Sequence, residues 1–351
     1  MTLSRLISAV AITSMLSFAS ISATQAEPLK VVSSFTIIGD MVKNVGGEHV
    51  VVDNLVGYDV DLHNFEPRAR DIKKLTMDSG VKLLFINGMA LEPWIERMQN
   101  SSGYKGQTIV VSEGVEAIKF ADIHDNEHDH DDHDHDHDHD HDHDHDHDHD
   151  HDHDHDHDHD HDHDHDHDHD HDHDHHHHGE WDPHAWQNPL NAVVYVNHIL
   201  QALKTTDPDN ATAYEANAAN YIAEIKKIDD EAKLAFAELP EVKRRFGTNH
   251  EAFAYLAEAY DLVQIPVFGV SGAEPSASQI ADVLKELKAQ QVSAVFLENT
   301  ANNRLIEQVA HDSGVKVGGT LVADALQKEG EGATYLGMIK KNIRTLLEAL
   351  K

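Results

Sequence analysis

The chain has 351 residues, no cysteine and a formal net charge of −37 at pH 7. Much of that charge comes from one run of alternating histidine and aspartate at residues 124–178, without which the formal charge is −11. No basic residues cluster in the remainder, so we expect no nucleic-acid partner. Outside this run and the first residues, roughly 270 residues remain, which is enough for two domains.

The N-terminal residues 1–26 are predicted to be a cleaved signal peptide. Arg5 supplies a positive start, residues 6–18 are apolar, and residues 23–26 offer small side chains to signal peptidase. The apolar stretch is too short to span a bilayer, although an uncleaved anchor is the alternative. Because the sequence has no cysteine to carry a lipid, we expect a protein of the Gram-negative periplasm that is not lipid-anchored.

Residues 27–206 are predicted to form an N-terminal lobe. Apolar, β-branched runs predict strands at 29–34, 50–56, 81–86 and 108–111. Helical patterns predict helices at 37–45, 68–77, 91–98 and 189–203. Such alternation of strands and helices favours α/β layers with largely parallel sheets.

The histidine–aspartate run interrupts this lobe. It holds 28 of the chain's 34 histidines and nothing apolar, so it cannot form a packed core and is predicted to be a disordered, solvated loop. Imidazole and carboxylate groups bind zinc and related metals, which favours metal capture near a main site. Buffering or sensing of metal is a second interpretation, and a plain solvated spacer is a third.

Residues 207–240 predict one long helix. Asp207 and Pro208 suit its start, and an apolar stripe with spacings of four and three continues from Tyr214 to Ala235. About 30 helical residues span roughly 45 Å. We therefore expect a rigid strut that links two domains.

Residues 241–351 repeat the strand–helix alternation and predict a C-terminal lobe. Strands are predicted at 245–248, 263–267, 292–297 and 315–321. Helices are predicted at 251–260, 276–290, 304–311 and 335–350. The fold class predicted for the whole chain is therefore α/β, with two lobes that each hold a mostly parallel sheet flanked by helices.

Four metal-capable residues stand where such sheets bind ligands, beyond the carboxyl ends of strands. His63 follows the second strand, and His184 comes just after the run. His250 ends the first strand of the second half, and Asp324 ends its last strand. Three imidazoles and one carboxylate suit a tetrahedral zinc ion, so we predict that these residues form one closed site.

Each of these residues also has a purely structural interpretation. A single histidine at a strand end is commonly structural, Asp324 alone suits a turn or a helix cap, and Asp182 before a proline suits a turn. Only the joint placement of the four favours metal. We interpret His49, His198 and His311 as surface or helix residues, because they lack this placement.

Several motifs together resemble one family. They are Val-Val-Ser-Ser-Phe at 31–35, His-Asn-Phe-Glu-Pro at 63–67, Asp-Pro-His-Ala-Trp at 182–186, Thr-Asn-His-Glu-Ala-Phe-Ala-Tyr at 248–255, Glu-Pro-Ser at 274–276, Asp-Ala-Leu at 324–326 and Tyr335. In this order, the motifs are similar to those of the substrate-binding components of zinc ABC transporters, a family that also serves manganese. They extend over nearly the whole chain after residue 26.

The resemblance implies two α/β lobes bridged by a backbone helix, as in binding proteins of cluster A-I, with one metal in the cleft. It assigns the ligand roles to His63, His184, His250 and Asp324, and it implies a histidine-rich insertion before the second ligand. It also implies an inner-membrane permease as partner. No Walker-type phosphate loop occurs, so the ATPase is expected to be a separate subunit. A periplasmic zinc chaperone is a possible further partner, and we expect a monomer.

Zn²⁺ is the expected cargo, and not a catalytic cofactor. Manganese prefers oxygen ligands, and manganese-type members carry a carboxylate where this chain has His250, so the donor set favours zinc. A manganese-uptake protein and a periplasmic zinc store are the alternatives. We expect no enzyme, because four protein ligands leave no open position; water in place of Asp324 would instead create a hydrolytic type of centre.

Overall fold

The computed structural model describes residues 27–120, 180–268 and 276–351. The predicted signal peptide at 1–26 and the histidine–aspartate run at 124–178 both lie outside the described residues. Among the helices of the described part, none combines the length and the apolar character that crossing a membrane requires.

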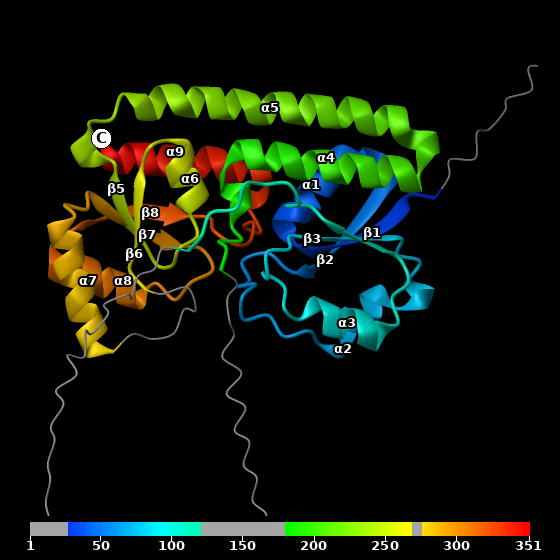
Figure 1. Cartoon of the computed structure of the whole chain (residues 1–351), viewed down its shortest axis with the longest axis horizontal. Coiled ribbons are helices and arrows are strands. Elements are labelled where there is room, and N and C mark those ends of the chain that lie inside the picture. The colour runs from blue at the N-terminus through cyan, green and yellow to red at the C-terminus, as the bar shows by residue number, and fades with distance from the viewer. Residues whose placement is uncertain (1–26, 121–179, 269–275) are drawn as a thin grey trace, which may run out of the picture.

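The N-terminal half contains a parallel four-stranded sheet. Its strands are β1 (Leu29–Phe35), β2 (Val50–Val56), β3 (Leu83–Ile86) and β4 (Gln107–Val110), in the order β2-β1-β3-β4. The helices between them are α1 (Thr36–Gly46), α2 (Ala69–Ile72) and α3 (Ile95–Ser102). In this half, α1 covers one face of the sheet, and α2 and α3 lie on the other side (Figure 1).

The C-terminal half repeats the same topology. Its strands are β5 (Arg245–Thr248), β6 (Val263–Pro266), β7 (Ala294–Glu298) and β8 (Lys316–Leu321), in the order β6-β5-β7-β8. Its helices are α6 (Ala254–Ala259), α7 (Ala277–Ala289), α8 (Arg304–Ser313) and α9 (Tyr335–Leu350). The prediction of an α/β fold with two parallel sheets flanked by helices is confirmed.

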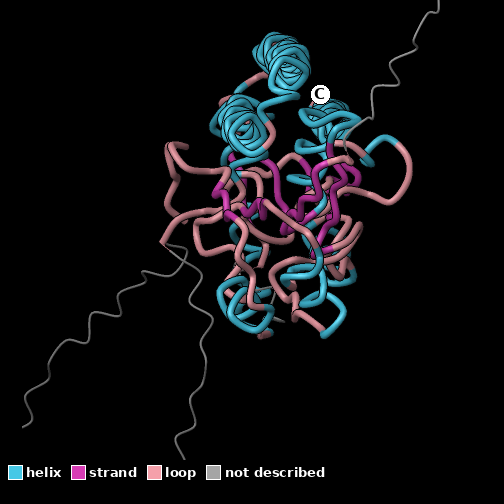
Figure 2. Tube along the Cα trace, turned by 90° about the vertical axis from the view of Figure 1, so that its right-hand side faces the viewer, coloured by secondary structure: helices cyan, strands magenta, loops and turns pink. Residues whose placement is uncertain are grey.

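Two helices connect the halves. Helix α4 (Pro189–Thr206) begins at Asn188, whose side chain accepts a hydrogen bond from the Leu190 amide, with proline in the first turn. Helix α5 (Ala211–Ala237) follows a short 3-10 turn and runs against α1, α4 and α9, so it extends over both sheets (Figure 1). Figure 2 shows the resulting layers, with helices above and below the strands.

The apolar core joins the two halves. One continuous cluster contains Phe35 of the first sheet, Phe296 of the second, and Tyr214 of α5, all fully buried. A second, smaller cluster lies under α7 and α8. Side chains on β7 alternate between the two, because Phe296 belongs to the large cluster and Val295 to the small one. Helix α5, which extends over both sheets, therefore shares one apolar core with them.

Two predicted helices of the first half differ from the structure. The helix predicted at 68–77 ends after α2, because the Thr76 hydroxyl bonds to the Lys73 carbonyl and the Ser79 hydroxyl to the Thr76 carbonyl, which competes with helical pairing. The helix predicted at 91–98 begins only at Ile95. Pro93 disfavours a helical conformation in the residue before it, so the helix follows the proline.

A third difference concerns the segment after His250. The helix predicted at 251–260 begins only at Ala254, which leaves residues 249–253 as a loop. In that loop, the Thr248 hydroxyl and the Gln264 side-chain amide both donate to the His250 carbonyl. These bonds hold His250 outside a helix, in a fixed position at the end of β5.

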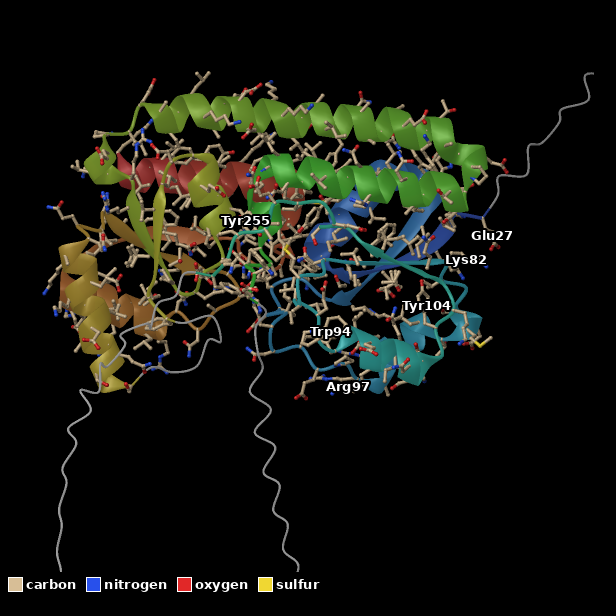
Figure 3. The ribbon with its side chains drawn as sticks, viewed as in Figure 1. Glu27, Lys82, Trp94, Arg97, Tyr104 and Tyr255 are labelled. Carbon is tan, nitrogen blue, oxygen red and sulfur yellow. The ribbon has the colours of Figure 1, made fainter. Side chains whose placement is uncertain are left out.

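The chain segments that flank residues 121–179 pair with each other. The Asp182 amide donates to the Ile118 carbonyl at 2.8 Å. Tyr255 bridges the same two residues, because its hydroxyl donates to the Asp182 carbonyl and accepts from the Ile118 amide. It lies near the middle of the long axis of the molecule (Figure 3). The chain thus leaves and re-enters the described fold at one place.

Candidate metal centre

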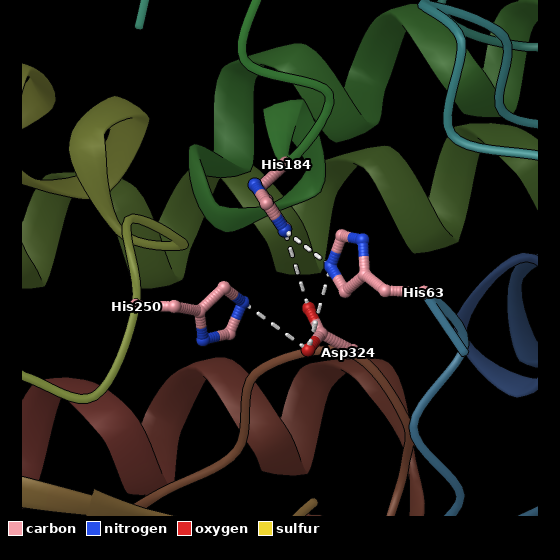
Figure 4. A group of neighbouring side chains, drawn as sticks. All are labelled: His63, His184, His250 and Asp324. Atoms are coloured by element: carbon pink, nitrogen blue, oxygen red, sulfur yellow. Dashed lines mark hydrogen bonds and ion pairs between the residues drawn. The ribbon is translucent and has the colours of Figure 1, made fainter. Parts of the chain in front are cut away.

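The structure brings the four predicted ligands, His63, His184, His250 and Asp324, together (Figure 4). One ligand atom from each lies within 4.8 Å of every other. The Nε2 atoms of His63 and His184 are 3.2 Å apart, and those of His184 and His250 are each 3.4 Å from an oxygen of Asp324. His63 Nε2 is 3.9 Å from the same carboxylate. Side chains that are distant in sequence therefore converge on one point.

Each half contributes two of these residues, but by different routes. In the C-terminal half, His250 stands two residues after β5 and Asp324 three residues after β8. In the N-terminal half, His63 stands seven residues after β2, on the loop 57–68, and His184 precedes α4. The C-terminal pair is thus mounted close to strand ends, at the edge where open parallel sheets bind ligands.

Two buried carboxylates orient two of the imidazoles. Asp182 Oδ1 lies 2.6 Å from Nδ1 of His184 and also accepts from the His184 amide. Glu298 Oε2 lies 2.6 Å from Nδ1 of His250, and its Oε1 accepts from the His250 amide. A carboxylate at Nδ1 holds the proton on that nitrogen, which directs the Nε2 lone pair of the neutral ring toward the centre.

His63 is held by its own loop. Its backbone amide donates to Asp61 Oδ1 at 2.9 Å, and the adjacent Leu62 is buried. The Phe65 ring packs edge-on against Trp94, with centroids 4.9 Å apart. The His63 side chain is 11 % exposed, whereas that of His184 is fully buried. His63 and His250, whose side chain is also 11 % exposed, are therefore the two imidazoles that solvent can reach.

The residues just before Asp324 are bound by the segment that follows His184. The Trp186 indole N–H donates to the Ala323 carbonyl, and the Gln187 side-chain amide donates to the carbonyls of Val322 and Ala323. Trp186 and Gln187 are fully buried. Because both follow His184 directly in the chain, these bonds join the two halves beneath the cluster.

The charges at the cluster depend on one another. Burial alone would raise the pKa of Asp324, but the neighbouring histidines, above all His250, hold it well below its usual value. Burial alone would lower the pKa of His250, but the carboxylates of Glu298 and Asp324 raise it well above its usual value. In the metal-free cluster, these opposite shifts favour a charge pair between His250 and its neighbouring carboxylates.

The cluster leaves polar atoms without hydrogen bonds. Among the described residues, Nε2 of His250 and Oδ1 of Asp324 are buried and have no hydrogen-bond partner. Burying such atoms unpaired costs about 1–3 kcal/mol each. In tetrahedral zinc sites with metal–ligand distances of about 2.0–2.1 Å, neighbouring ligand atoms stand about 3.3–3.5 Å apart. The separations of 3.2 and 3.4 Å match that spacing, and 3.9 Å is slightly longer.

Two residues of this centre were not predicted as such. Asp182 was interpreted as a turn former, whereas it holds the His184 ring. Glu298 was not singled out, although it stands at the carboxyl end of a buried strand, which is the one signal that points to it. The other three described histidines lie elsewhere: His49 packs edge-on to Tyr214, His198 bonds to the Glu113 carbonyl, and His311 pairs with Asp312.

Known proteins resemble the chain over most of its length. It is 26 % identical to the manganese ABC transporter substrate-binding lipoprotein PsaA of Streptococcus pneumoniae over 337 residues, which is 94 % of this chain and 91 % of the relative. It is also 26 % identical to the iron ABC transporter substrate-binding lipoprotein MtsA of Streptococcus pyogenes serotype M1, over 93 % of this chain and 90 % of the relative. Both relatives are named lipoproteins, which stands against our expectation of an unanchored protein.

Among solved structures, the fold matches that of the periplasmic zinc-binding protein TroA from Treponema pallidum. The TM-score is 0.70 at 21 % identity, and the match covers 92 % of this chain and 99 % of that structure. A model of the ZnuA family, described as the periplasmic component A of the zinc-uptake complex, matches residues 31–349. The chain therefore belongs to the ZnuA family of periplasmic metal-binding components of ABC transporters.

Proposed function

We propose that the protein captures Zn²⁺ in the periplasm with His63, His184, His250 and Asp324 and delivers it to an ABC permease. The observation that supports this most directly is the convergence of three imidazole Nε2 atoms and one carboxylate on a single point. Such a donor set, drawn from two halves of the chain, suits a tetrahedral dication.

The buried polar atoms favour a metal over a purely structural role for the cluster. A bound dication would satisfy Nε2 of His250 and Oδ1 of Asp324 at once. The carboxylates of Asp182 and Glu298 form the carboxylate–histidine pairs that support metal-binding imidazoles. A structural cluster of three histidines has no need of two such supports.

The nitrogen-rich donor set favours zinc as cargo. Imidazole suits zinc, whereas manganese prefers carboxylate, carbonyl and water oxygens. The alternative is manganese, and the PsaA relative favours it by name. MtsA is named for iron, so membership of the family alone leaves the metal open.

A competition titration separates these cargoes. The metal-free protein is mixed with a chromophoric chelator, and Zn²⁺ or Mn²⁺ is added at neutral pH. We expect the protein to bind one equivalent of Zn²⁺ more tightly than Mn²⁺. Tighter binding of Mn²⁺ would overturn the zinc assignment and would leave the transport function in place.

In this proposal, metal binding ties the lobes 27–206 and 241–351 together. Two ligands come from each lobe, so the ion closes the cleft, and release requires that the ligands separate. A membrane permease would induce that separation, and a separate ATPase subunit would supply the energy. Four protein ligands leave no position for a reacting water, so we propose no enzymatic activity. A zinc chaperone and a monomeric state remain predictions.

Storage of zinc is the second candidate function, and the histidine–aspartate run at 124–178 favours it. A store needs many sites of similar strength and no ordered cleft. The test is His63→Ala, with zinc binding measured by titration. Under the transport proposal, the variant binds the tight equivalent about a hundredfold more weakly. If zinc binding were almost unchanged, storage would be the better description.

A further inference from the structure

Several hydrogen bonds cross between the halves near the cluster, and two sets of them differ in exposure. The first set lies beneath it, where buried Trp186 and Gln187 bind the Val322–Ala323 segment. The second set lies at the exposed edge of the contact between the halves, which we call the rim. It centres on Asp59, an exposed residue of the loop that carries His63. Exposed bonds open at lower cost than buried ones, because water replaces the lost partners. The rim is therefore where the halves can separate first.

Asp59 makes three hydrogen bonds to the other half. Its Oδ1 accepts from the Asn299 side-chain amide at 3.1 Å, and its Oδ2 accepts from the Lys328 backbone amide at 3.0 Å. Its own backbone N–H donates to the Leu326 carbonyl at 3.0 Å. One residue of the His63 loop thus contacts two separate segments of the C-terminal half.

These segments also carry or support metal-centre residues. Asn299 directly follows Glu298, which orients His250. The Asn299 side chain also donates to the Ala325 carbonyl and accepts from the Ala323 amide, so it binds the chain on both sides of Asp324. The Asp59–Asn299 contact therefore connects the loop of one ligand with the supports of two others.

The backbone at Asp59 turns sharply, in a conformation that its contacts across the rim help to fix. Its φ angle is +54°, a left-handed conformation that is uncommon outside glycine. The loop is packed in part through buried Leu62 and through Phe65 against Trp94, and a hollow of about 680 Å³ borders Gly57, Val60, Asp61 and Asn64. The loop thus keeps space beside it, and the contacts of Asp59 add a direct hold on the other half.

We propose that Asp59 is a positioning residue that fastens the His63 loop across the rim and thereby slows the release of the bound cation. This inference rests on the proposed function, because it assigns a role in that same site. When the hydrogen bonds of Asp59 open, His63 can move away from the other three ligands. The buried bonds of Trp186 and Gln187 keep the two halves joined. A permease that opens this contact would release the metal without separating the shared core.

Three variants test the inference in the full-length protein. Asp59→Gly removes the carboxylate without conflict at a positive φ angle. Asp59→Asn keeps the acceptor for Asn299 but faces the Lys328 amide with a donor. Asp53→Asn is the matched control, because Asp53 is an exposed carboxylate that pairs with Lys74, within the same half. The probe is Zn²⁺ alone, and its dissociation is followed by stopped flow against excess chelator.

We expect Asp59→Gly to release Zn²⁺ about five- to tenfold faster than the wild type, because two modest hydrogen bonds are lost. Asp59→Asn should fall between Asp59→Gly and the wild type, and Asp53→Asn should match the wild type. In the metal-free protein, amide hydrogen exchange of residues 57–68 should be faster in Asp59→Gly, and exchange in α5 should be unchanged.

A release rate of Asp59→Gly within twofold of the wild type overturns the inference, and so does an equal increase in Asp53→Asn. The exchange measurement does not depend on metal, so it separates the two proposals. If the wild type lacked a tight zinc site but Asp59→Gly loosened residues 57–68, the zinc function would fail and the rim contact would stand. Unchanged exchange there would overturn the contact itself.

Discussion

The two halves have the same strand order, but they present their metal-centre residues differently. In the C-terminal half, His250 and Asp324 stand within three residues of β5 and β8, and Glu298 is itself the last residue of β7. In the N-terminal half, His63 lies on a seven-residue extension beyond β2, and His184 precedes a helix. The C-terminal half thus holds its ligands next to strand ends, and the N-terminal half holds its ligands on connecting loops.

Two halves with the same strand order can therefore hold their ligands with different rigidity. Ligands close to strand ends inherit the order of the sheet. His184 has the same kind of carboxylate support as His250, from Asp182 and Glu298 respectively, whereas the His63 loop is fastened to the other half through Asp59. We therefore expect the C-terminal half to be the preformed part of the site and the His63 loop to be the part that closes on the metal.

The largest effect is expected from removing a ligand of the preformed half. His250→Ala should weaken the tight zinc equivalent by at least about a thousandfold, because a fixed ligand is lost and Glu298 is left buried without its partner. His63→Ala should cost less, about a hundredfold, because its loop is held less firmly and water can take the vacated position. Competition titration measures both, with His311→Ala as the control. A larger loss in His63→Ala would break the comparison.

A smaller effect is expected from the two supporting carboxylates. Glu298→Gln and Asp182→Asn should each weaken zinc binding by about 10- to 100-fold, because the neutral amide supports the imidazole less well. The same titration measures both, and the conservative Asp53→Asn change controls for lost charge. If Asp182→Asn left the affinity unchanged, the second histidine would need no support, contrary to the proposed contrast.

The pH dependence sharpens the role of His250. Glu298 and Asp324 overcome the effect of burial and raise its pKa in the metal-free protein, so Zn²⁺ must displace a proton from its ring. Zinc affinity should therefore fall as pH decreases through neutrality, by about one order of magnitude per pH unit for each displaced proton. Calorimetry in two buffers of different ionisation enthalpy measures proton release. Glu298→Gln should release fewer protons, and equal release would contradict this assignment.

The smallest effect on the tight site is expected from deleting residues 124–178. The segments that flank them pair through Ile118, Asp182 and Tyr255, and this pairing lies outside the deleted residues. The tight equivalent should stay within about twofold of the wild type, and any weaker zinc equivalents should be lost. Loss of the tight equivalent would contradict a site that is built by the two halves alone.

The sequence allowed good prediction of what depends on local pattern. The strand at 50–56 and the terminal helix at 335–350 match β2 and α9, because their apolar periodicity is strong. His63, His250 and Asp324 were predicted from their places after strands, since parallel strands bring such positions to one edge, and His184 was predicted from its place after the histidine–aspartate run. The helix at 68–77 was predicted too long, because side-chain bonds of Thr76 and Ser79 compete with helical ones.

What the sequence did not reveal depends on contacts between distant segments. Glu298 supports His250 across 48 positions, and Asp59 reaches Asn299 across 240. No local periodicity marks either pair. Asp182 looked like a turn former because the following proline dominates the local pattern. The role of Asp182 in orienting His184 is visible only in the structure, where its carboxylate contacts the His184 ring.

The pairing of the chain at Ile118 and Asp182 has a consequence for how the protein can evolve. Because the inserted segment starts and ends at one place, the fold sets no number of His-Asp units between those points. Copies of the gene that gain or lose His-Asp repeats would thus change the number of histidines between those points and leave the four clustered residues in place.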